Sequence, residues 1–362
     1  MSADGTLGDR LARRGVSRRA LLKYSAYLAS LMALPPSLAP AMAEELAKVR
    51  RQAVIWLSFQ ECTGCTESLT RSHAPTLEDL IFNFISLDYH HTLMAVSGEA
   101  AEDARRASMA ENKGKYLVIV DGSVPTKDDG VYSTIAGQTN LAMLQETAEH
   151  AFAVISVGTC AAFGGLPYAN PNPTGASPVS KLVPGKPVVN IPGCPPIPEA
   201  MSGTLAHLLA FGKVPALDHL NRPKAFFGET IHDRCYRRPF YEQGLFAKSF
   251  DDEGARKGWC LYEVGCKGPI AYNACATMKW NGGVSFPIQS GHGCFACASP
   301  NFWDQGGFYK PLSAGTRKSD MVLGGAAVAG AAIGAGAAAL ARRRKHTLID
   351  TLSRNGEQNG PS

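Results

Sequence analysis

Ten cysteines carry most of the chemistry that this 362-residue sequence could perform. Two pairs have the Cys-X-X-Cys spacing that lets both thiolates bind one metal centre: Cys62 with Cys65, and Cys294 with Cys297. The other six are Cys160, Cys194, Cys235, Cys260, Cys266 and Cys275. Five disulfides are the alternative in an exported protein, but a chain of this length does not need crosslinks to hold a core. We therefore expect the sulfurs to bind metal.

Four cysteines, which we call the first set, follow predicted strands of one sheet. Cys62 and Cys65 come just after the apolar run 53–59, Cys160 just after 152–157 and Cys194 just after 187–191. Because the carboxyl ends of parallel strands share one edge, three loops would bring four thiolates together. Four thiolates suit an iron–sulfur cluster or a structural zinc. The wide spread of these ligands along the chain favours the cluster.

One imidazole and six thiols lie in a stretch after residue 222 that is rich in Gly, Pro and aromatic residues: His232, Cys235, Cys260, Cys266, Cys275, Cys294 and Cys297. His232 lies three residues before Cys235, at a chelating offset, so the first four residues form a second set of four ligands. The last three form a third set without a fourth cysteine, which suits a cluster with three irons. A surface or satisfied core histidine is the alternative for His232, and we keep it for the other eight histidines.

The elements that must position these ligands alternate along the first part of the chain. Apolar runs predict strands at 53–59, 116–120, 152–157 and 187–191, and helical stretches are expected around 76–95, 138–150 and 198–211. This alternation predicts an α/β domain over 44–220, with a parallel sheet covered on both faces. No G-x-G-x-x-G loop precedes a helix, so we expect no flavin or nucleotide.

The stretch 221–312 has no long periodic segment except 239–248. Such a length without regular elements is unusual in a compact domain. It becomes reasonable if metal clusters hold the chain together in place of a large apolar core. We therefore expect an irregular cluster-binding domain there.

The two ends of the chain carry its basic charge. The net charge is +5, of which residues 1–43 contribute +4 and 342–362 contribute +3, leaving −2 for 44–341. A body without excess positive charge argues against binding of nucleic acid. Arg18-Arg19, an apolar run and Ala41-Met42-Ala43 follow in the order of a twin-arginine export signal. An Arg-rich disordered N-terminus is the alternative; we expect a signal peptide over 1–43 that lies outside the fold.

The C-terminal region has the pattern of a membrane anchor. Residues 321–341 are uncharged and as long as the hydrocarbon core of a bilayer requires. The basic run 342–345 should stay cytoplasmic, which places the body on the periplasmic side of the cell membrane. A flexible Ala/Gly linker is the alternative. We expect a linker at 313–320, a transmembrane helix at 321–341 and a cytoplasmic tail at 342–362.

Several motifs in one order resemble those of a known family. They are Glu61-Cys62-Thr63-Gly64-Cys65-Thr66-Glu67, Gly158-Thr159-Cys160, Pro192-Gly193-Cys194-Pro195-Pro196, His232-Asp233-Arg234-Cys235 and Gly293-Cys294-Phe295-Ala296-Cys297. From about residue 17 to 345 the sequence resembles the small subunit of membrane-bound nickel–iron uptake hydrogenases. The resemblance implies a flavodoxin-like first domain. It also implies a proximal [4Fe–4S] cluster on the first set, a distal [4Fe–4S] cluster on the second and a medial [3Fe–4S] cluster on the third.

The same resemblance implies how such a chain works. Hydrogen would be oxidised at a nickel–iron centre in a separate large subunit, so this chain would hold no catalytic residue. Electrons would pass through the proximal, medial and distal clusters to a membrane acceptor, either a cytochrome b or another quinone-linked subunit. An electron-transfer subunit of a different periplasmic oxidoreductase is the alternative.

The resemblance also assigns secondary roles to single residues. Pro287 matches the proline that occupies the vacant corner of the medial cluster, and Glu67 could relay protons, bond across the subunit interface or cap a helix. Gly64 and Gly165 stand where oxygen-tolerant members carry extra cysteines, so we expect activity to be lost in air. Four basic residues near the second set either guide docking or are solvated surface charges: Arg234, Arg237, Arg238 and Lys267.

Overall fold

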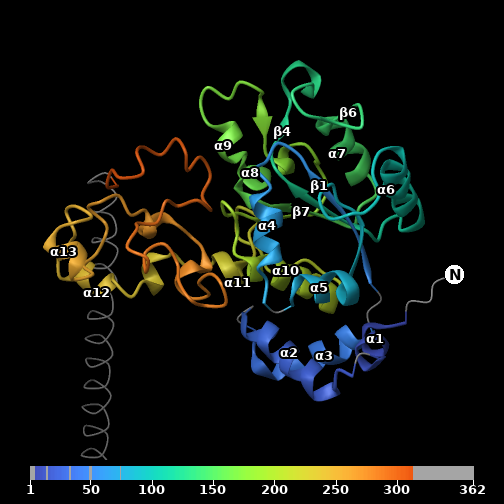
Figure 1. Cartoon of the computed structure of the whole chain (residues 1–362), viewed down its shortest axis with the longest axis horizontal. Coiled ribbons are helices and arrows are strands. Elements are labelled where there is room, and N and C mark those ends of the chain that lie inside the picture. Colours follow the sequence, from blue (N-terminus) through green and yellow to red (C-terminus); the bar gives the residue numbers. More distant parts are fainter. Residues whose placement is uncertain (1–4, 14, 32–33, 49–50, 74, 313–362) are drawn as a thin grey trace, which may run out of the picture. The chain divides into compact units, whose positions relative to one another are not determined.

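The computed structural model describes residues 5–13, 15–31, 34–48, 51–73 and 75–312. Its centre is a five-stranded parallel sheet with the strand order β2-β1-β3-β7-β9 (Figure 1). The strands are β1 (Gln52–Ser58), β2 (Ile85–Tyr89), β3 (Leu117–Asp121), β7 (Ala153–Val157) and β9 (Val188–Ile191). This is the flavodoxin-like strand order, and the four strands expected from the sequence lie within one residue of their predicted bounds.

Strand side chains alternate between two apolar layers, so both faces of the sheet are covered, as predicted. On one face Val54, Trp56 and Ile119 pack with α4 (Gly64–Thr70) and α10 (Pro198–Phe211). On the other face Ile55 and Val118 pack with α6 (Glu99–Glu111) and α7 (Asn140–Ala148). The shorter elements of this part are α5 (Leu77–Asp79), the π-helical turn η2 (Leu80–Phe84), β4 (Val124–Pro125), η3 (Lys127–Gly130), β5 (Thr134–Ile135), β6 (Gln138–Thr139), α8 (Gly158–Phe163), α9 (Gly165–Tyr168), β8 (Ala176–Ser177) and η4 (Val179–Lys181).

The prediction of a helical stretch around 76–95 is wrong for the second half of that range. Helical turns end at Phe84, and the chain continues directly into β2. β2 is an edge strand that pairs in parallel with β1 alone. Its apolar residues alternate with Ser86 and Asp88, because one side of an edge strand can face polar surroundings. Helix α6 was not predicted.

The stretch after residue 221 is irregular, as expected. Its helices are single turns or little more: α11 (Lys224–Phe227), η5 (His232–Arg234), α12 (Arg238–Glu242), α13 (Glu253–Arg256), η6 (Gly268–Ile270) and η7 (Ala274–Ala276). The helix expected over 239–248 ends at Glu242, and Gly244 turns the chain with a φ of 71°. A small apolar cluster that includes Ile231, Leu261 and Phe286 lies among these turns. Both predicted domains fall within one compact unit that ends at Pro311.

The N-terminal segment does not lie outside the fold, contrary to our expectation. It forms α1 (Leu7–Arg13), α2 (Arg18–Leu31), η1 (Pro36–Leu38) and α3 (Ala39–Lys48), which we together call the leader. Leu28, Met42 and Leu46 are each 0% exposed and belong to the apolar cluster that contains α10. These helices carry an apolar side, and packing it on the body removes that side from water.

The predicted anchor region 313–362, with its linker, transmembrane helix and tail, lies outside the described residues. In the part of the chain that is described, no helix combines the length and the apolar character that crossing a bilayer requires.

Candidate metal centres

The first set lies at the carboxyl edge of the sheet, as the strand positions predict. Cys62 and Cys65 lie at the start of α4 beyond β1, Cys160 lies in α8 beyond β7, and Cys194 follows β9. Burial, together with the nearby Cys194 and Cys62, raises the pKa of the Cys160 thiol to about 12. Burial likewise raises the pKa of Cys65, with Asp121, Cys160 and Cys194 adding to it. The four thiols therefore lie close enough together for their charges to interact.

Two glycines make room for these sulfurs. Gly158 has a φ of 84°, and a Cβ atom there would lie 2.4 Å from the Cys65 sulfur. Gly165 has a φ of 58°, and its Cβ would lie 2.6 Å from the Cys160 sulfur. Real side chains do not tolerate such approaches, so both positions need glycine for space as well as for backbone conformation. The space around the first set is thus shaped by the backbone.

Sequence reasoning missed Asp121 beside the first set. It ends β3 at the same edge of the sheet and is fully buried. Burial, together with the charge of Glu61, raises the pKa of its carboxyl group to about 7. The signal was available, because Asp121-Gly122 directly follows an apolar run that ends where the other ligand loops begin.

Glu67 lies in the first turn of α4. Its carboxylate accepts a hydrogen bond from Arg71 Nε at 2.7 Å, and both side chains are about half exposed. The Arg71 guanidinium also reaches Asn281 Oδ1 at 3.4 Å. The side chain of Glu67 therefore pairs along α4 and lies at the surface, where it is accessible to a partner subunit.

The second set lines a single cavity. His232, Cys235, Cys260 and Cys266 all line it. Burial, together with the nearby Cys266 and Cys235, raises the pKa of the Cys260 thiol to about 12. His232 thus lies with three thiols, as its offset from Cys235 predicts.

The basic residues near the second set do not form one docking surface. Arg237 is 6% exposed and donates to the Trp259 carbonyl oxygen at 2.7 Å, while Lys267 is 4% exposed and donates to the Lys310 carbonyl oxygen. A surface docking role is therefore wrong for these two. Arg234 and Arg238 are exposed and form ion pairs with Glu229 and Glu242.

The third set gathers three thiols from two loops. Cys275 lies in η7, and Cys294 and Cys297 lie in the loop near residue 296. Burial, together with the nearby Cys297, raises the pKa of the Cys275 thiol to about 12. The Trp280 side chain donates a hydrogen bond to the Cys275 sulfur, a contact that sequence reasoning missed. Pro287 is exposed, between the buried Phe286 and Ile288.

The third set lies between the other two. The backbone amide of Cys294 donates to the Cys266 sulfur of the second set at 3.3 Å. On the other side, the charges of Cys194 and Cys297 interact, and the Thr159 hydroxyl donates to the Cys297 carbonyl oxygen. This order of the ligand sets is the one that the proximal, medial and distal positions implied by the resemblance require.

The chemistry of these sites fits iron–sulfur clusters. All ten cysteines are free thiols, so the alternative of five disulfides is wrong. Within the described ranges, no three or more His, Cys, Asp or Glu side chains lie close enough to share a single metal ion. Sets of three or four converging Cys and His side chains suit iron–sulfur clusters, which would displace the thiol protons on binding.

Two family profiles match the chain. The profile of the NADH ubiquinone oxidoreductase 20 Kd subunit matches residues 62–208, and the C-terminal profile of the NiFe/NiFeSe hydrogenase small subunit matches residues 227–310. The first match covers the first set, and the second covers the other two. The two profiles together therefore contain every predicted ligand.

Relatives match the chain along nearly its whole length. The uptake hydrogenase small subunit of Azotobacter vinelandii is 46% identical over 99% of this chain and 100% of the relative. The hydrogenase-1 small chain of Escherichia coli K12 is 42% identical over 97% of this chain and 96% of the relative.

A solved structure has the same fold. The [NiFeSe] hydrogenase of Desulfovibrio vulgaris Hildenborough aligns with a TM-score of 0.68 and 38% identity, over 72% of this chain and 98% of that chain. These matches decide against a subunit of a different oxidoreductase. The chain belongs to the nickel–iron hydrogenase small-subunit family, and it acts as one part of a hydrogenase heterodimer with the nickel–iron large subunit.

Proposed function

We propose that this chain conducts electrons from the large subunit through three iron–sulfur clusters. The first set would hold a proximal [4Fe–4S] cluster, the third a medial [3Fe–4S] cluster and the second a distal [4Fe–4S] cluster. When bound, the clusters supply one-electron oxidation and reduction. The observation that carries the proposal is the contiguity of the three sets, with the third in contact with each of the others.

The residues around each site support this division of work. The first set has two exposed members, Cys62 and Cys194, so it can lie close to a partner subunit. The second set has a neutral imidazole ligand in place of one thiolate, which removes a negative charge and should raise the potential of a cluster held there. Arg237 is buried beside the same thiols and acts in the same direction, because its charge favours a more negative cluster.

We further propose that the protein is exported by the twin-arginine route and works on the periplasmic side of the cell membrane. Arg18 and Arg19 are exposed on α2, which suits recognition of the pair. The apolar run 321–341 would anchor the chain, and its acceptor would be a cytochrome b or another quinone-linked subunit. Shortening the chain to end at Leu312 should move the heterodimer from the membrane fraction to the soluble periplasmic fraction. An unchanged membrane fraction would count against the anchor.

Metal analysis of the purified heterodimer tests the proposed clusters. We expect about eleven irons in this subunit, with matching labile sulfide, and nickel in the large subunit. The oxidised complex should show the electron paramagnetic resonance signal of a three-iron cluster. Nickel without labile sulfide would overturn the proposal while leaving the family assignment intact.

A further inference from the structure

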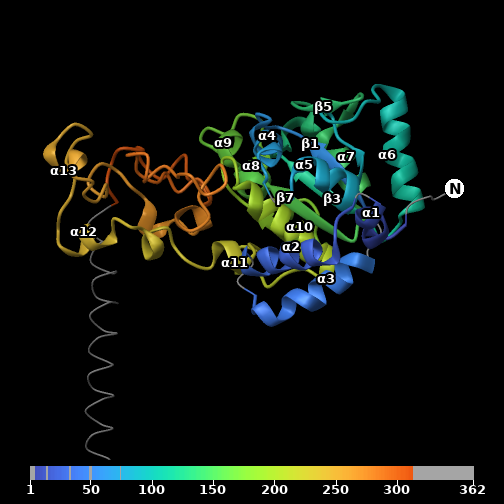
Figure 2. The same ribbon diagram turned by 60° about the horizontal axis from the view of Figure 1, so that its bottom comes forward.

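Two exposed aromatic side chains lie next to each other near the end of the described chain. Phe250 is 48% exposed and Tyr309 is 60% exposed, and their ring centroids lie 5.8 Å apart. The His292 ring stacks on Phe250 and also contacts Tyr309. Figures 1 and 2 both show the last coloured segment of the chain beside the loop that leads into α13. Phe250 and Tyr309 therefore form one surface, which we call the aromatic patch.

The backbone that carries Tyr309 is fixed to the loop of the second set. Gly265 has a φ of 103°, and a Cβ atom there would lie 2.6 Å from Tyr309 Cα, so only glycine allows this approach. The Lys267 ammonium group donates a hydrogen bond to the Lys310 carbonyl oxygen. Because Cys266 lies between Gly265 and Lys267, the aromatic patch is held at a fixed place beside the second set.

The predicted anchor lacks the residues that usually mark the ends of a transmembrane helix. Trp and Tyr are enriched at both surfaces of a bilayer, where their rings lie among the lipid headgroups. No Phe, Trp or Tyr follows Tyr309 in the sequence, so neither the predicted linker 313–320 nor the apolar run 321–341 carries one. On the periplasmic side, an aromatic contact between this chain and the membrane can therefore come only from the body.

The aromatic patch lies within reach of the bilayer. The described part of the chain ends at Leu312, and the predicted anchor begins at residue 321. A chain of that length spans at most about 30 Å. Lys248 and Lys310 are exposed on the two segments that carry the patch, and lysines near a membrane are attracted to anionic lipids. The neighbouring Asp251 and Asp252 accept hydrogen bonds within their own loop.

We propose that Phe250 and Tyr309 rest among the lipid headgroups of the membrane that holds the predicted anchor. The inference rests on the proposed anchor and goes beyond it, because it states which side of the body faces the bilayer. Two aromatic rings do not retain a protein on a membrane by themselves, so the patch orients a subunit that the anchor retains. The second set then lies at the membrane surface, where its electrons pass to the membrane acceptor.

Photo-crosslinking of the full-length heterodimer in lipid vesicles tests the contact. The photoreactive amino acid p-benzoylphenylalanine takes the place of Tyr309 in one variant. In the control it takes the place of Tyr132, which is 47% exposed and lies between η3 and β5. The vesicles contain phosphatidylcholine and phosphatidylglycerol and no other protein. The probe at 309 should form at least about tenfold more lipid adducts than the probe at 132. Equal yields would overturn the proposal.

The same preparation separates this proposal from the proposed anchor. A heterodimer that does not sediment with the vesicles would overturn the anchor and, with it, the lipid contact. A heterodimer that sediments but forms no lipid adduct at 309 would overturn the lipid contact alone. In native membranes, adducts of the probe at 309 with a membrane protein in place of lipid would also overturn the proposal, because the patch would then dock on that protein.

A matched pair of substitutions tests the orienting role. Tyr309→Ser should lower the rate of quinone reduction in membranes, relative to the rate with a soluble dye, by at least about threefold, because a less oriented subunit meets its acceptor less often. The electron paramagnetic resonance signals of the clusters should not change, since no ligand is altered. Tyr132→Ser should leave the ratio of the two rates as in the wild type. An unchanged ratio in Tyr309→Ser would overturn the orienting role.

Discussion

At the scale of single residues, Gly158 controls the space for the first set. In Gly158→Ala the new methyl group would lie 2.4 Å from the Cys65 sulfur, at a φ of 84° that alanine rarely adopts. We expect this variant to lose iron from the first set and to unfold at a lower temperature, because the sulfur must move out of place. Iron per chain and the thermal midpoint measure the two effects.

Gly137→Ala is the matched control for this change. Gly137 has a φ of 78°, but apart from its chain neighbours no atom lies within 4 Å of the place that a methyl group would take, so the variant carries the backbone strain without the clash. It should cost about 1 kcal/mol of stability and keep its iron. Equal iron contents in the two variants would show that the close approach at Gly158 does not matter.

His90 makes stability depend on pH. It is 0% exposed, and its ring lies 5.1 Å from that of Trp56. Burial, together with the charge of His91, lowers its pKa from 6.5 to about 4. In the unfolded chain His90 binds a proton as the pH falls below 6.5, whereas in the folded chain it binds one only near pH 4. Between these two pH values the folded state therefore loses about 3 kcal/mol of stability relative to the unfolded state.

His90→Phe should therefore flatten the acid side of the stability profile. Thermal midpoints between pH 7.5 and 5 should fall less steeply for the variant than for the wild type. Parallel profiles would mean that His90 does not cause the slope.

The pKa of Glu146 is set by two opposing effects. Burial opposes its charge, but hydrogen bonds from Gln138 and Arg105 lower its pKa overall. The contribution of Glu146 to stability is therefore lost only at lower pH.

Cysteine spacing predicted which sulfurs converge, but not the residues around them. The three ligand sets could be recognised in the sequence because metal ligation restricts the residue type to Cys and His and places these residues at short offsets. Asp121, Arg237 and Trp280 belong to no such pattern, since carboxylates, arginines and indoles occur throughout any chain. Their contacts with the thiols arise from the path of the backbone.

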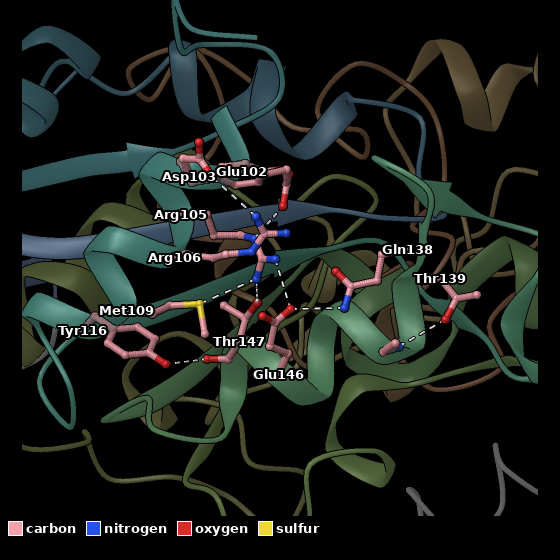
Figure 3. A network of polar contacts seen from close by, with 12 residues as sticks. Glu102, Asp103, Arg105, Arg106, Met109, Tyr116, Gln138, Thr139, Glu146 and Thr147 are labelled. Carbon is pink, nitrogen blue, oxygen red and sulfur yellow. Dashed lines mark hydrogen bonds and ion pairs between the residues drawn. The ribbon is translucent and has the colours of Figure 1, made fainter. Parts of the chain in front are cut away.

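At the scale of elements, the buried network between α6 and α7 ties two helices together. Figure 3 shows Arg105 of α6 between Glu102 on its own helix and Glu146 and Thr147 on α7. Arg105 is 0% exposed, and its Nε lies 2.9 Å from Glu102 Oε2. Arg105→Ala leaves the buried Glu102 without its cation and should cost about 3–5 kcal/mol.

The neighbouring Arg106 provides the control. Its side chain is 56% exposed, and it pairs with Asp103 at 3.5 Å. Arg106→Ala should change the free energy of unfolding by less than about 1 kcal/mol. Denaturant titration of both variants measures the difference. Similar values for the two would indicate that the network is not a stabilising contact between the helices.

The central strands could be predicted because they are continuous apolar runs, buried on both faces. β3 and β7 are buried at every residue. β2 could not be recognised in the same way, since an edge strand alternates polar and apolar residues over only five positions and follows helical turns directly. Short alternating segments carry little periodic signal, so tertiary pairing with β1 decides their structure.

At the scale of the whole molecule, the sequence predicted an export signal at the N-terminus but not where that segment packs. The leader has the order of an export signal, and nothing in that order names a docking surface. It packs on an apolar side of α10. That side can be recognised only when it is known that the opposite side of α10 packs against the sheet. Long-range packing of this kind is the part of a fold that local patterns do not encode.

The order of the three ligand sets is also a property of the whole molecule, and it leads to a test of the electron path. Cys297→Ser removes a ligand of the third set, which lies between the other two. The three-iron signal should disappear and acceptor reduction should fall at least about tenfold, because the cluster that connects the first and second sets would be missing. Exchange of hydrogen isotopes between hydrogen gas and water, which the large subunit catalyses, should persist, because that reaction transfers no electron out of the large subunit.

Ser299→Ala changes the same loop without touching a ligand. Ser299 is buried at 7% exposure, two residues from Cys297, so it reports any general disturbance of the loop. It should keep both the three-iron signal and acceptor reduction. If Cys297→Ser lost the signal but still reduced the acceptor at the wild-type rate, electrons would not need the third set, and its position between the other two would have only a structural role.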